Sequence, residues 1–217
     1  MRGEKTGFCR IARSYRALEK LAFGGRLQRA RTANLSVLDA AEEVLVLGEG
    51  NGLFLKQLLA RNARCRVTVV EASPVMIELA RKRLEEKCLA RATFLCRDVR
   101  ASKWRGERFD AVVAPFFLDC FEERSLSAFL PGLAASLKPK GLWLLADFVE
   151  PDGPGGVRRI LNAYILRGLY AFFRATCSIE ARRVADPLPI LEGCGLRVIR
   201  RRDFPGGLLH SVVLEKP

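Results

Sequence analysis

The sequence lacks the features that mark several large classes of protein. No apolar run in its 217 residues reaches the roughly 18 residues that a membrane-spanning helix needs. The opening residues, MRGEKTGFCRIARSY, contain no apolar core of a secretory signal, and Glu4 and Glu19 do not fit the acid-poor composition of an organelle transit peptide. We therefore expect a cytoplasmic protein.

Paired cysteines are also missing. The seven cysteines are scattered, with no CxxC spacing: Cys9, Cys65, Cys88, Cys96, Cys120, Cys177 and Cys194. A disulfide framework or a zinc site would need such pairs, so we expect free thiols and no bound metal. The chain has only one histidine, which shortens the list of catalytic bases.

Two common nucleotide-binding motifs are absent as well. No GxxxxGK[ST] loop occurs, which excludes a P-loop nucleotide site. The glycine-rich segment at residues 48–52 has the form GxGxG, and Leu53 occupies the third glycine position of the dinucleotide fingerprint GxGxxG. This difference argues against an NAD-dependent oxidoreductase.

Acidic residues are too few to balance the basic ones, so the formal net charge is +13. A basic surface suits RNA, an anionic membrane face or an acidic substrate, and it can also consist of solvated helix faces without a partner. The basic residues are spread along the chain and contain no RNA-binding motif. Solvated faces are the favoured interpretation.

From Val44 onwards, short apolar runs alternate with amphipathic stretches, which is typical of a parallel sheet with crossover helices. The pattern predicts strands at residues 44–48, 66–71, 92–98, 109–114, 142–148, 196–201 and 208–215. It predicts helices at residues 53–61, from residue 73 onwards, at 122–137 and at 157–175. We expect Lys138-Pro139-Lys140-Gly141 to break the third of these helices.

The first predicted strand runs through alternating glycines into a helix, as nucleotide-binding turns do. Gly48, Gly50 and Gly52 lack side chains, so the backbone can approach a ligand and the helix can pack closely. Glu71 ends the second strand, 19 residues after Gly52, where a carboxylate can accept hydrogen bonds from both ribose hydroxyls of an adenosine ligand. Asp98, at the end of the third strand, is placed to meet an adenine edge.

In these features residues 44–148 resemble the class I S-adenosylmethionine (SAM)-dependent methyltransferases, especially the ubiquinone/menaquinone C-methyltransferase-like group. The resemblance implies an α/β, Rossmann-like, seven-stranded and mostly parallel sheet with strand order 3-2-1-4-5-7-6, an antiparallel last strand and helices on both faces. It implies SAM as the cofactor. The implied cofactor-binding residues are Gly48, Glu49, Gly50, Gly52, Glu71, Ala72, Asp98, Val99, Ala114 and Pro115.

One position departs from that family. Many members have an acid two residues before the first glycine, where this chain has Val46, so a contact to the amino group of the cofactor is in question. We expect a single domain over residues 1–217. Its parts are a helical cap (1–43), a cofactor-binding core (44–148), a linker and helical insertion over the acceptor site (149–190) and a C-terminal β-hairpin (191–217).

The sequence offers fewer candidates for catalytic residues than for cofactor-binding residues. In-line displacement at a sulfonium methyl needs mainly alignment, but a phenol, thiol, amine or quinol acceptor benefits from a base. Asp119 follows the fourth strand, where the family often places such groups, and His210 is the only histidine, for which a structural place on a half-exposed strand is the alternative. Tyr15, in IARSY, resembles a tyrosine that closes over the cofactor in the C-methyltransferases. Weaker candidates are Asp147, Tyr164 and Tyr170.

We therefore expect methyl transfer from SAM to a small, aromatic or lipophilic metabolite. The apolar segment at residues 157–175 would roof the acceptor pocket or touch a peripheral membrane surface. An RNA or protein methyltransferase, suggested only by charge, and a catalytically silent SAM-binding partner protein remain alternatives. Nucleic acid is not an expected partner, and the residues leave the acceptor atom and the oligomeric state open.

Overall fold

The computed structural model describes every residue except 1–24, 103, 105, 151–156 and 178. Tyr15 and most of the predicted N-terminal cap therefore lie outside the described residues. No helix among the described residues has the length and apolar character needed to cross a membrane.

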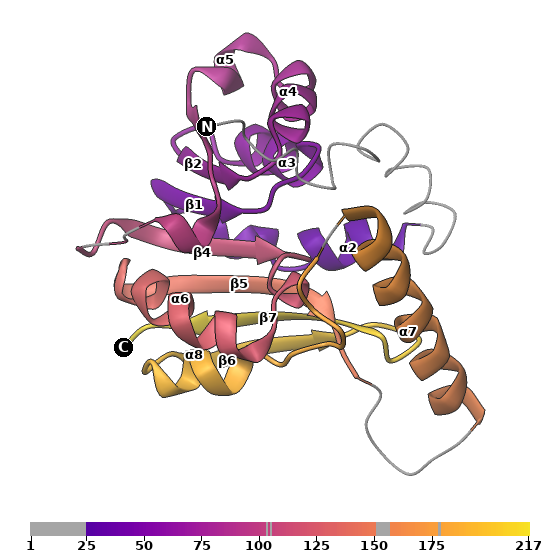
Figure 1. The fold of residues 1–217 in the computed structure, drawn as a ribbon. Helices are drawn as coiled ribbons and strands as arrows, with labels where there is room; N and C mark the ends of the chain where they lie inside the picture. The colour runs from indigo at the N-terminus through magenta and orange to yellow at the C-terminus, as the bar shows by residue number, and fades with distance from the viewer. Residues whose placement is uncertain (1–24, 103, 105, 151–156, 178) are drawn as a thin grey trace.

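A seven-stranded sheet forms the centre, with the order β3-β2-β1-β4-β5-β7-β6 (Figure 1). The strands are β1 (Glu43–Leu47), β2 (Arg66–Glu71), β3 (Ala92–Cys96), β4 (Phe109–Pro115), β5 (Leu137–Phe148), β6 (Arg197–Asp203) and β7 (Leu209–Glu215). Strands β1 to β5 pair in parallel, and β7 runs antiparallel to both of its neighbours. This confirms the predicted strand order and the antiparallel last strand.

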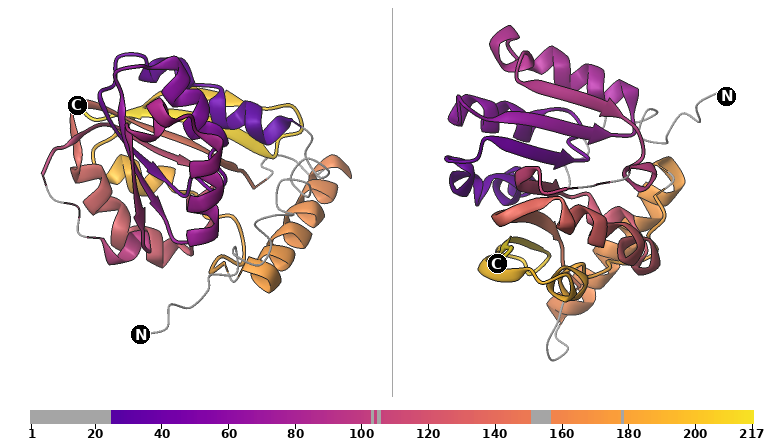
Figure 2. Two further views of the ribbon diagram at one scale, coloured as in Figure 1. Left: turned by 90° about the horizontal axis from the view of Figure 1, so that it is seen from above. Right: turned by 90° about the vertical axis from the view of Figure 1, so that its left-hand side faces the viewer.

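Helices cover both faces of the sheet (Figure 2). They are α2 (Arg26–Thr32), α3 (Leu53–Arg61), α4 (Pro74–Arg83), α5 (Glu86–Leu89), α6 (Glu123–Ala135), α7 (Val157–Cys177) and α8 (Leu188–Gly193), with short 3-10 turns η1 (Leu35–Leu38), η2 (Val99–Ala101) and η3 (Leu118–Cys120). Leu45 and Leu47 of β1 pack in the core with α6 and α8, whereas Val44 and Val46 pack in the core with α3. Because both faces of β1 are buried, its sequence is continuously apolar.

The segment Lys138–Gly141 corrects one prediction. The sequence predicts that these residues end the helix and that the next strand begins at residue 142. The helix α6 does end before them, at Ala135, but the residues themselves belong to β5, which begins at Leu137. Leu137 pairs with Phe109 and Leu142 pairs with Ala111, so the intervening residues form a bulge. Within the bulge Pro139 is exposed and Lys140 adopts a left-handed backbone conformation (φ 62°). The short helices α5 and α8 were not predicted, because four and six residues are too few to establish a helical period.

Gly52 shows why the turn after β1 needs glycine. It caps the N-terminus of α3 with φ 84°, a left-handed conformation that side chains disfavour. A Cβ atom added there would lie 2.7 Å from the Cα of Ala80 in α4. The close approach of α3 and α4 therefore requires a residue without a side chain at this position.

We expect Gly52→Ala to lower the free energy of unfolding by about 1–3 kcal/mol, because it combines backbone strain with a contact against backbone atoms. Urea denaturation would measure this loss. Gly132→Ala is the matched control, since a Cβ at Gly132 in α6 meets nothing within 4 Å and should stabilise the helix by about 0.5–1 kcal/mol. Equal effects of the two substitutions would contradict the packing constraint.

Candidate functional site

A cavity of about 450 Å³ opens at the carboxyl ends of the central strands. Its volume lies within the range of about 300–1,000 Å³ that is usual for small-molecule sites. Strand order reverses between β1 and β4, and ligands of doubly wound sheets bind at such a reversal. Residues of α2, α4 and α7 complete the wall.

Most of the predicted cofactor residues line this cavity: Gly48, Glu49, Gly50, Glu71, Ala72, Asp98, Val99 and Pro115. Two do not. Gly52 packs against α4, and Ala114 is fully buried within the sheet. The candidate base Asp119 also lines the cavity.

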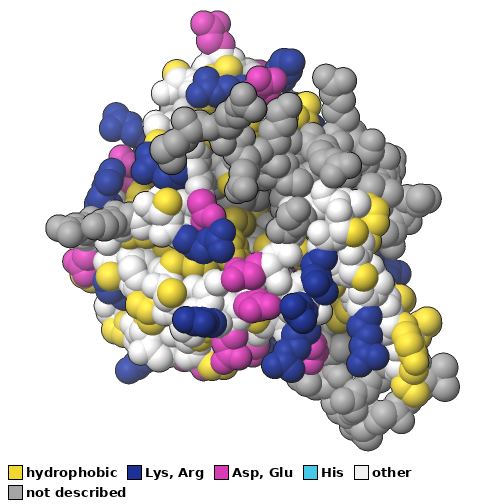
Figure 3. Space-filling model, in the orientation of Figure 1, with side chains coloured by type: hydrophobic (Ala, Val, Ile, Leu, Met, Phe, Trp, Pro, Cys, Tyr) yellow, Lys and Arg dark blue, Asp and Glu magenta, His cyan; other side chains and the backbone are white. Residues whose placement is uncertain are grey.

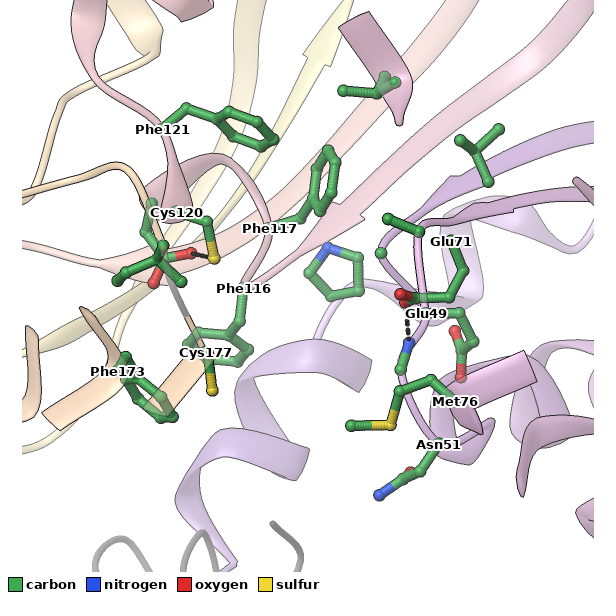
Figure 4. Close-up of a pocket in the computed structure, with 18 of the residues that line it drawn as sticks. Glu49, Asn51, Glu71, Met76, Phe116, Phe117, Cys120, Phe121, Phe173 and Cys177 are labelled. Carbon is green, nitrogen blue, oxygen red and sulfur yellow. Dashed lines mark hydrogen bonds between the residues drawn. The ribbon is translucent and has the colours of Figure 1, made fainter. Parts of the chain in front are cut away.

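Glu71 fixes the glycine turn. Its buried carboxylate accepts a hydrogen bond from the backbone N–H of Gly50 at 3.1 Å (Figure 4). It accepts another from the backbone N–H of Ser73 at 2.8 Å. Burial raises the pKa of Glu71, and these hydrogen bonds oppose the rise. Each carboxylate oxygen has a second lone pair, which leaves acceptor capacity for the hydroxyls of a bound sugar.

Gly50 provides the space for such a ligand. Its φ is 65°, and a Cβ atom added there would meet nothing within 4 Å. The position lies on the cavity wall, so the open space above the backbone belongs to the cavity. An adenosine ligand therefore fits the residues present at this turn.

The two carboxylate oxygens of Glu49 differ in their hydrogen bonding. Oε1 accepts hydrogen bonds from the backbone N–H groups of Phe54 and Leu55, each at 3.1 Å, and so caps α3. Oε2 is buried and has no hydrogen-bond partner among the described residues, as expected of an atom that meets a donor on a ligand. Burial raises the pKa of Glu49 to about 7. Val46 is fully buried in the core and has no acidic group to offer a ligand. The acid of this segment is Glu49, which lies within the glycine turn itself.

Asp98 is already engaged by its own neighbour. Its carboxylate accepts hydrogen bonds from the backbone N–H of Arg100 at 2.8 Å and from the guanidinium of the same residue at 2.5–3.0 Å. The Arg100 guanidinium lowers the pKa of Asp98, and the Arg100 side chain also lies 5.6 Å from the centre of the Phe121 ring. Asp98 thus lies at the cavity wall, and its partner there is Arg100. The contact of Asp98 with an adenine edge stays a prediction.

The opposite end of the cavity is aromatic. Phe116, Phe121 and Phe173 lie on one side of the view in Figure 4, away from Glu49, Asn51 and Glu71 on the other. The Phe117 ring lies between the two groups and packs against Gly48 of the glycine turn, where an added Cβ atom would come within 2.1 Å of it. Phe116 adopts φ 54°, a strained conformation for an aromatic residue that is typical of functional sites. These aromatic residues were not predicted as site residues. The available signal was the Phe116-Phe117 pair directly after the carboxyl end of β4.

Asp119 lies in η3 beneath this aromatic end and is 8% exposed. Burial raises its pKa to about 6, opposed by the Cys120 thiol, which donates to it at 3.7 Å, and by the Tyr170 hydroxyl. Burial and the charge of Asp119 raise the pKa of Asp147 well above its usual range. The backbone N–H groups of Phe117 and Asp119 partly offset that rise, although Asp147 has no hydrogen bond of normal geometry among the described residues.

His210 lies opposite Asp147 in the β5–β7 pairing and is 4% exposed. It does not line the cavity. The expectation of a half-exposed strand is wrong, since β7 lies between β5 and β6 and is buried from Leu209 to Leu214. Burial lowers the pKa of His210 to about 4. Of the weaker candidates, Tyr170 lines the cavity, whereas Tyr164 is 65% exposed.

Known proteins are similar to this chain in sequence and in fold. A family profile described as a methyltransferase domain matches residues 44–141. Demethylmenaquinone methyltransferases of Thermotoga maritima and Thermus thermophilus are 27% and 30% identical, over 73% and 75% of this chain and 67% and 73% of their own lengths. An O-methyltransferase family protein from Burkholderia thailandensis superposes with a TM-score of 0.65 at 19% identity. That match covers 95% of this chain and 61% of the other, so the chain spans less than two thirds of this structural neighbour.

We expect Glu71→Ala to weaken SAM binding by about 1.5–3 kcal/mol, because it removes a charged hydrogen-bond acceptor and an anchor of the turn. Calorimetric titration with SAM would measure the change in Kd. Glu78→Ala, which alters an exposed acid on α4, is the control and should bind SAM as the unmodified protein does. Unchanged affinity in a folded Glu71→Ala variant would show that the predicted site is misplaced.

We expect Asp147→Asn to raise the Tm at pH 8. The raised pKa means that folding takes up a proton at Asp147, so the stability contributed by this group is complete below pH 4 and is lost as pH rises. Asparagine has no such proton to take up, so the variant does not lose stability in this way as pH rises. The difference in Tm between Asp147→Asn and the unmodified protein should therefore be smaller at pH 5 than at pH 8. Calorimetric unfolding at both pH values, with Asp203→Asn on exposed β6 as the control, measures the difference. A lower Tm of Asp147→Asn at pH 8 would contradict this account.

Proposed function

The chain belongs to the class I SAM-dependent methyltransferases, and we propose that it methylates a small, apolar or aromatic molecule bound at the aromatic end of the cavity. The observation that carries this proposal is the division of the cavity into two unlike ends. Glu49, Gly50 and Glu71 surround one end, and Phe116, Phe121 and Phe173 line the other, with the Phe117 ring between them against Gly48.

SAM supplies an already activated methyl group, so the residues of the chain have to bind, align and exclude water. In this proposal Glu71 accepts hydrogen bonds from the ribose hydroxyls, and the open face of Gly50 admits the ligand to the backbone. The unpaired Oε2 of Glu49 accepts from a donor on the same ligand. The phenylalanine side chains exclude water from the acceptor, and α7, within the 149–190 insertion, covers it.

Asp119 is the proposed base. A carboxyl group with a pKa of about 6 is mostly ionised at neutral pH and can take a proton from a phenol or quinol hydroxyl. Burial and the charge of Asp119 both raise the pKa of Asp147, so of the two acids Asp119 is the one that ionises first. His210 is buried, neutral at pH 7 and absent from the cavity wall, so it has no part in this scheme.

Two of the relatives support an aromatic acceptor, because they are named for demethylmenaquinone, which contains a naphthoquinone ring. A third relative, 28% identical over 65% of this chain, is named for malonyl-[acyl-carrier protein] and does not. A naphthoquinone ring matches the phenylalanine side chains at the acceptor end of the cavity. Reduced quinones and phenols are accordingly the first acceptors to test.

The decisive experiment is release of S-adenosylhomocysteine from SAM in the presence of naphthoquinols, phenols, amines or total RNA. We expect turnover with a quinol or a phenol and none with RNA. Label transferred only to RNA or protein would replace the proposal with the macromolecular alternative. Tight SAM binding without turnover on any acceptor would favour a catalytically silent partner protein.

We expect Asp119→Asn to lower kcat/KM by about 10²–10⁴-fold, the usual contribution of a general base, with the Kd for SAM unchanged. For the unmodified protein, kcat/KM should rise with pH through about 6 as Asp119 loses its proton. Asp203→Asn serves as the control because Asp203 lies on exposed β6. A pH profile that is flat between 5 and 7, or full activity of Asp119→Asn, would rule out this role.

A further inference from the structure

Helix α7 is apolar on two opposite faces. On its inner face Leu166 and Tyr170 are 5% and 3% exposed and pack in a buried cluster with Phe148 and Leu209. On its outer face five large apolar side chains are exposed, namely Ile160 (57%), Leu161 (57%), Tyr164 (65%), Ile165 (41%) and Phe172 (38%). These five residues are called the outer stripe.

The spacing of these residues makes them one continuous surface. The residues form two rows along the helix, with intervals of three and four residues. One row runs through residues 160, 164 and 168, and the other through residues 161, 165, 168 and 172. Gly168, where the rows meet, adds no polar group. At 1.5 Å per residue, the stripe is about 18 Å long. A helix on a protein surface normally presents polar residues outward, so this stripe is a feature that calls for a partner.

The charge around the stripe indicates the kind of partner. α7 contains no acidic residue, and Arg167 and Arg174 are exposed along its length. Figure 3 shows hydrophobic side chains at the outer edge of the molecule where α7 lies, with Lys and Arg side chains beside them. The net charge of +13 opposes the approach of a second copy and favours an anionic surface. An apolar stripe flanked by arginines is the pattern of helices that lie in the interface of anionic membranes.

The stripe is also continuous with the proposed acceptor end. Phe172 belongs to the stripe and lines the cavity, together with its neighbours Leu169, Tyr170 and Phe173. An apolar molecule leaving a lipid phase at the stripe would therefore meet the aromatic end of the cavity next. A polar acceptor would gain nothing from this arrangement.

We propose that the outer stripe of α7 docks on the surface of a bilayer containing anionic lipids and that the acceptor enters the cavity from the lipid phase. The docking itself depends only on the stripe and its arginines, whereas the entry of the acceptor rests on the proposed function. Apolar side chains enter the interface, and Arg167 and Arg174 contact lipid phosphates. The lipid surface thus concentrates both the enzyme and a lipophilic acceptor.

Cosedimentation of the full chain with vesicles tests the docking. We expect binding to phosphatidylcholine vesicles that contain phosphatidylglycerol, little binding to phosphatidylcholine alone, and weaker binding at high salt. The double variant L161S/I165S should lower the partition coefficient at least about tenfold, because two apolar side chains no longer enter the interface. Arg167→Gln should weaken binding about fivefold, and only on the anionic vesicles.

Ile199→Ser is the matched control, since Ile199 on β6 is 54% exposed and lies away from α7. It should bind vesicles as the unmodified protein does. All variants should keep the same Kd for SAM and the same turnover of a water-soluble acceptor, which separates this test from that of the proposed function.

Three results would overturn the docking proposal. One is that the unmodified chain does not bind anionic vesicles. Another is that Ile199→Ser loses as much binding as L161S/I165S. The third is light scattering that shows a dimer which L161S/I165S converts to a monomer, because a second copy would then cover the stripe.

Discussion

One buried carboxylate determines the geometry on which the site depends. Glu71 ends β2 and accepts hydrogen bonds from Gly50 and Ser73, so it joins the turn after β1 to the turn after β2. Glu49 acts from within the first turn by capping α3. Because both acids use only part of their hydrogen-bonding capacity, the same groups that shape the turn remain available to a ligand.

Local patterns predicted the parts of the structure that local physics determines. The apolar runs at β1, β2 and β4, the glycines at 48–52 and the acid at Glu71 each have a nearby cause in backbone conformation or strand burial. The aromatic end was not predictable in the same way, because Phe173 on α7 comes close to Phe116 only through the fold. Likewise, no sequence pattern showed that Asp98 would bind Arg100 or that Lys138–Gly141 would form a bulge in β5.

The two ends of the cavity differ in how they use charge. The acids at the glycine turn are fixed by backbone N–H groups, whereas Asp119, on the wall near the phenylalanine side chains, and Asp147 behind it are buried. Burial raises the pKa of both carboxyl groups, and the charge of Asp119 raises that of Asp147 further. Buried acids with raised pKa values are common in active sites, which is why Asp119 is the base in the proposed function.

The pKa of Glu49, about 7, has a thermodynamic consequence for ligand binding. SAM carries positive charge on its sulfonium and ammonium groups and negative charge on its carboxylate. In the proposed binding mode a positive group lies beside Glu49 and favours its ionised form. Binding near neutral pH would therefore displace a fraction of a proton from Glu49 into the buffer. The apparent enthalpy of binding would then differ between buffers according to their own heats of ionisation, and the affinity would rise with pH across the same range.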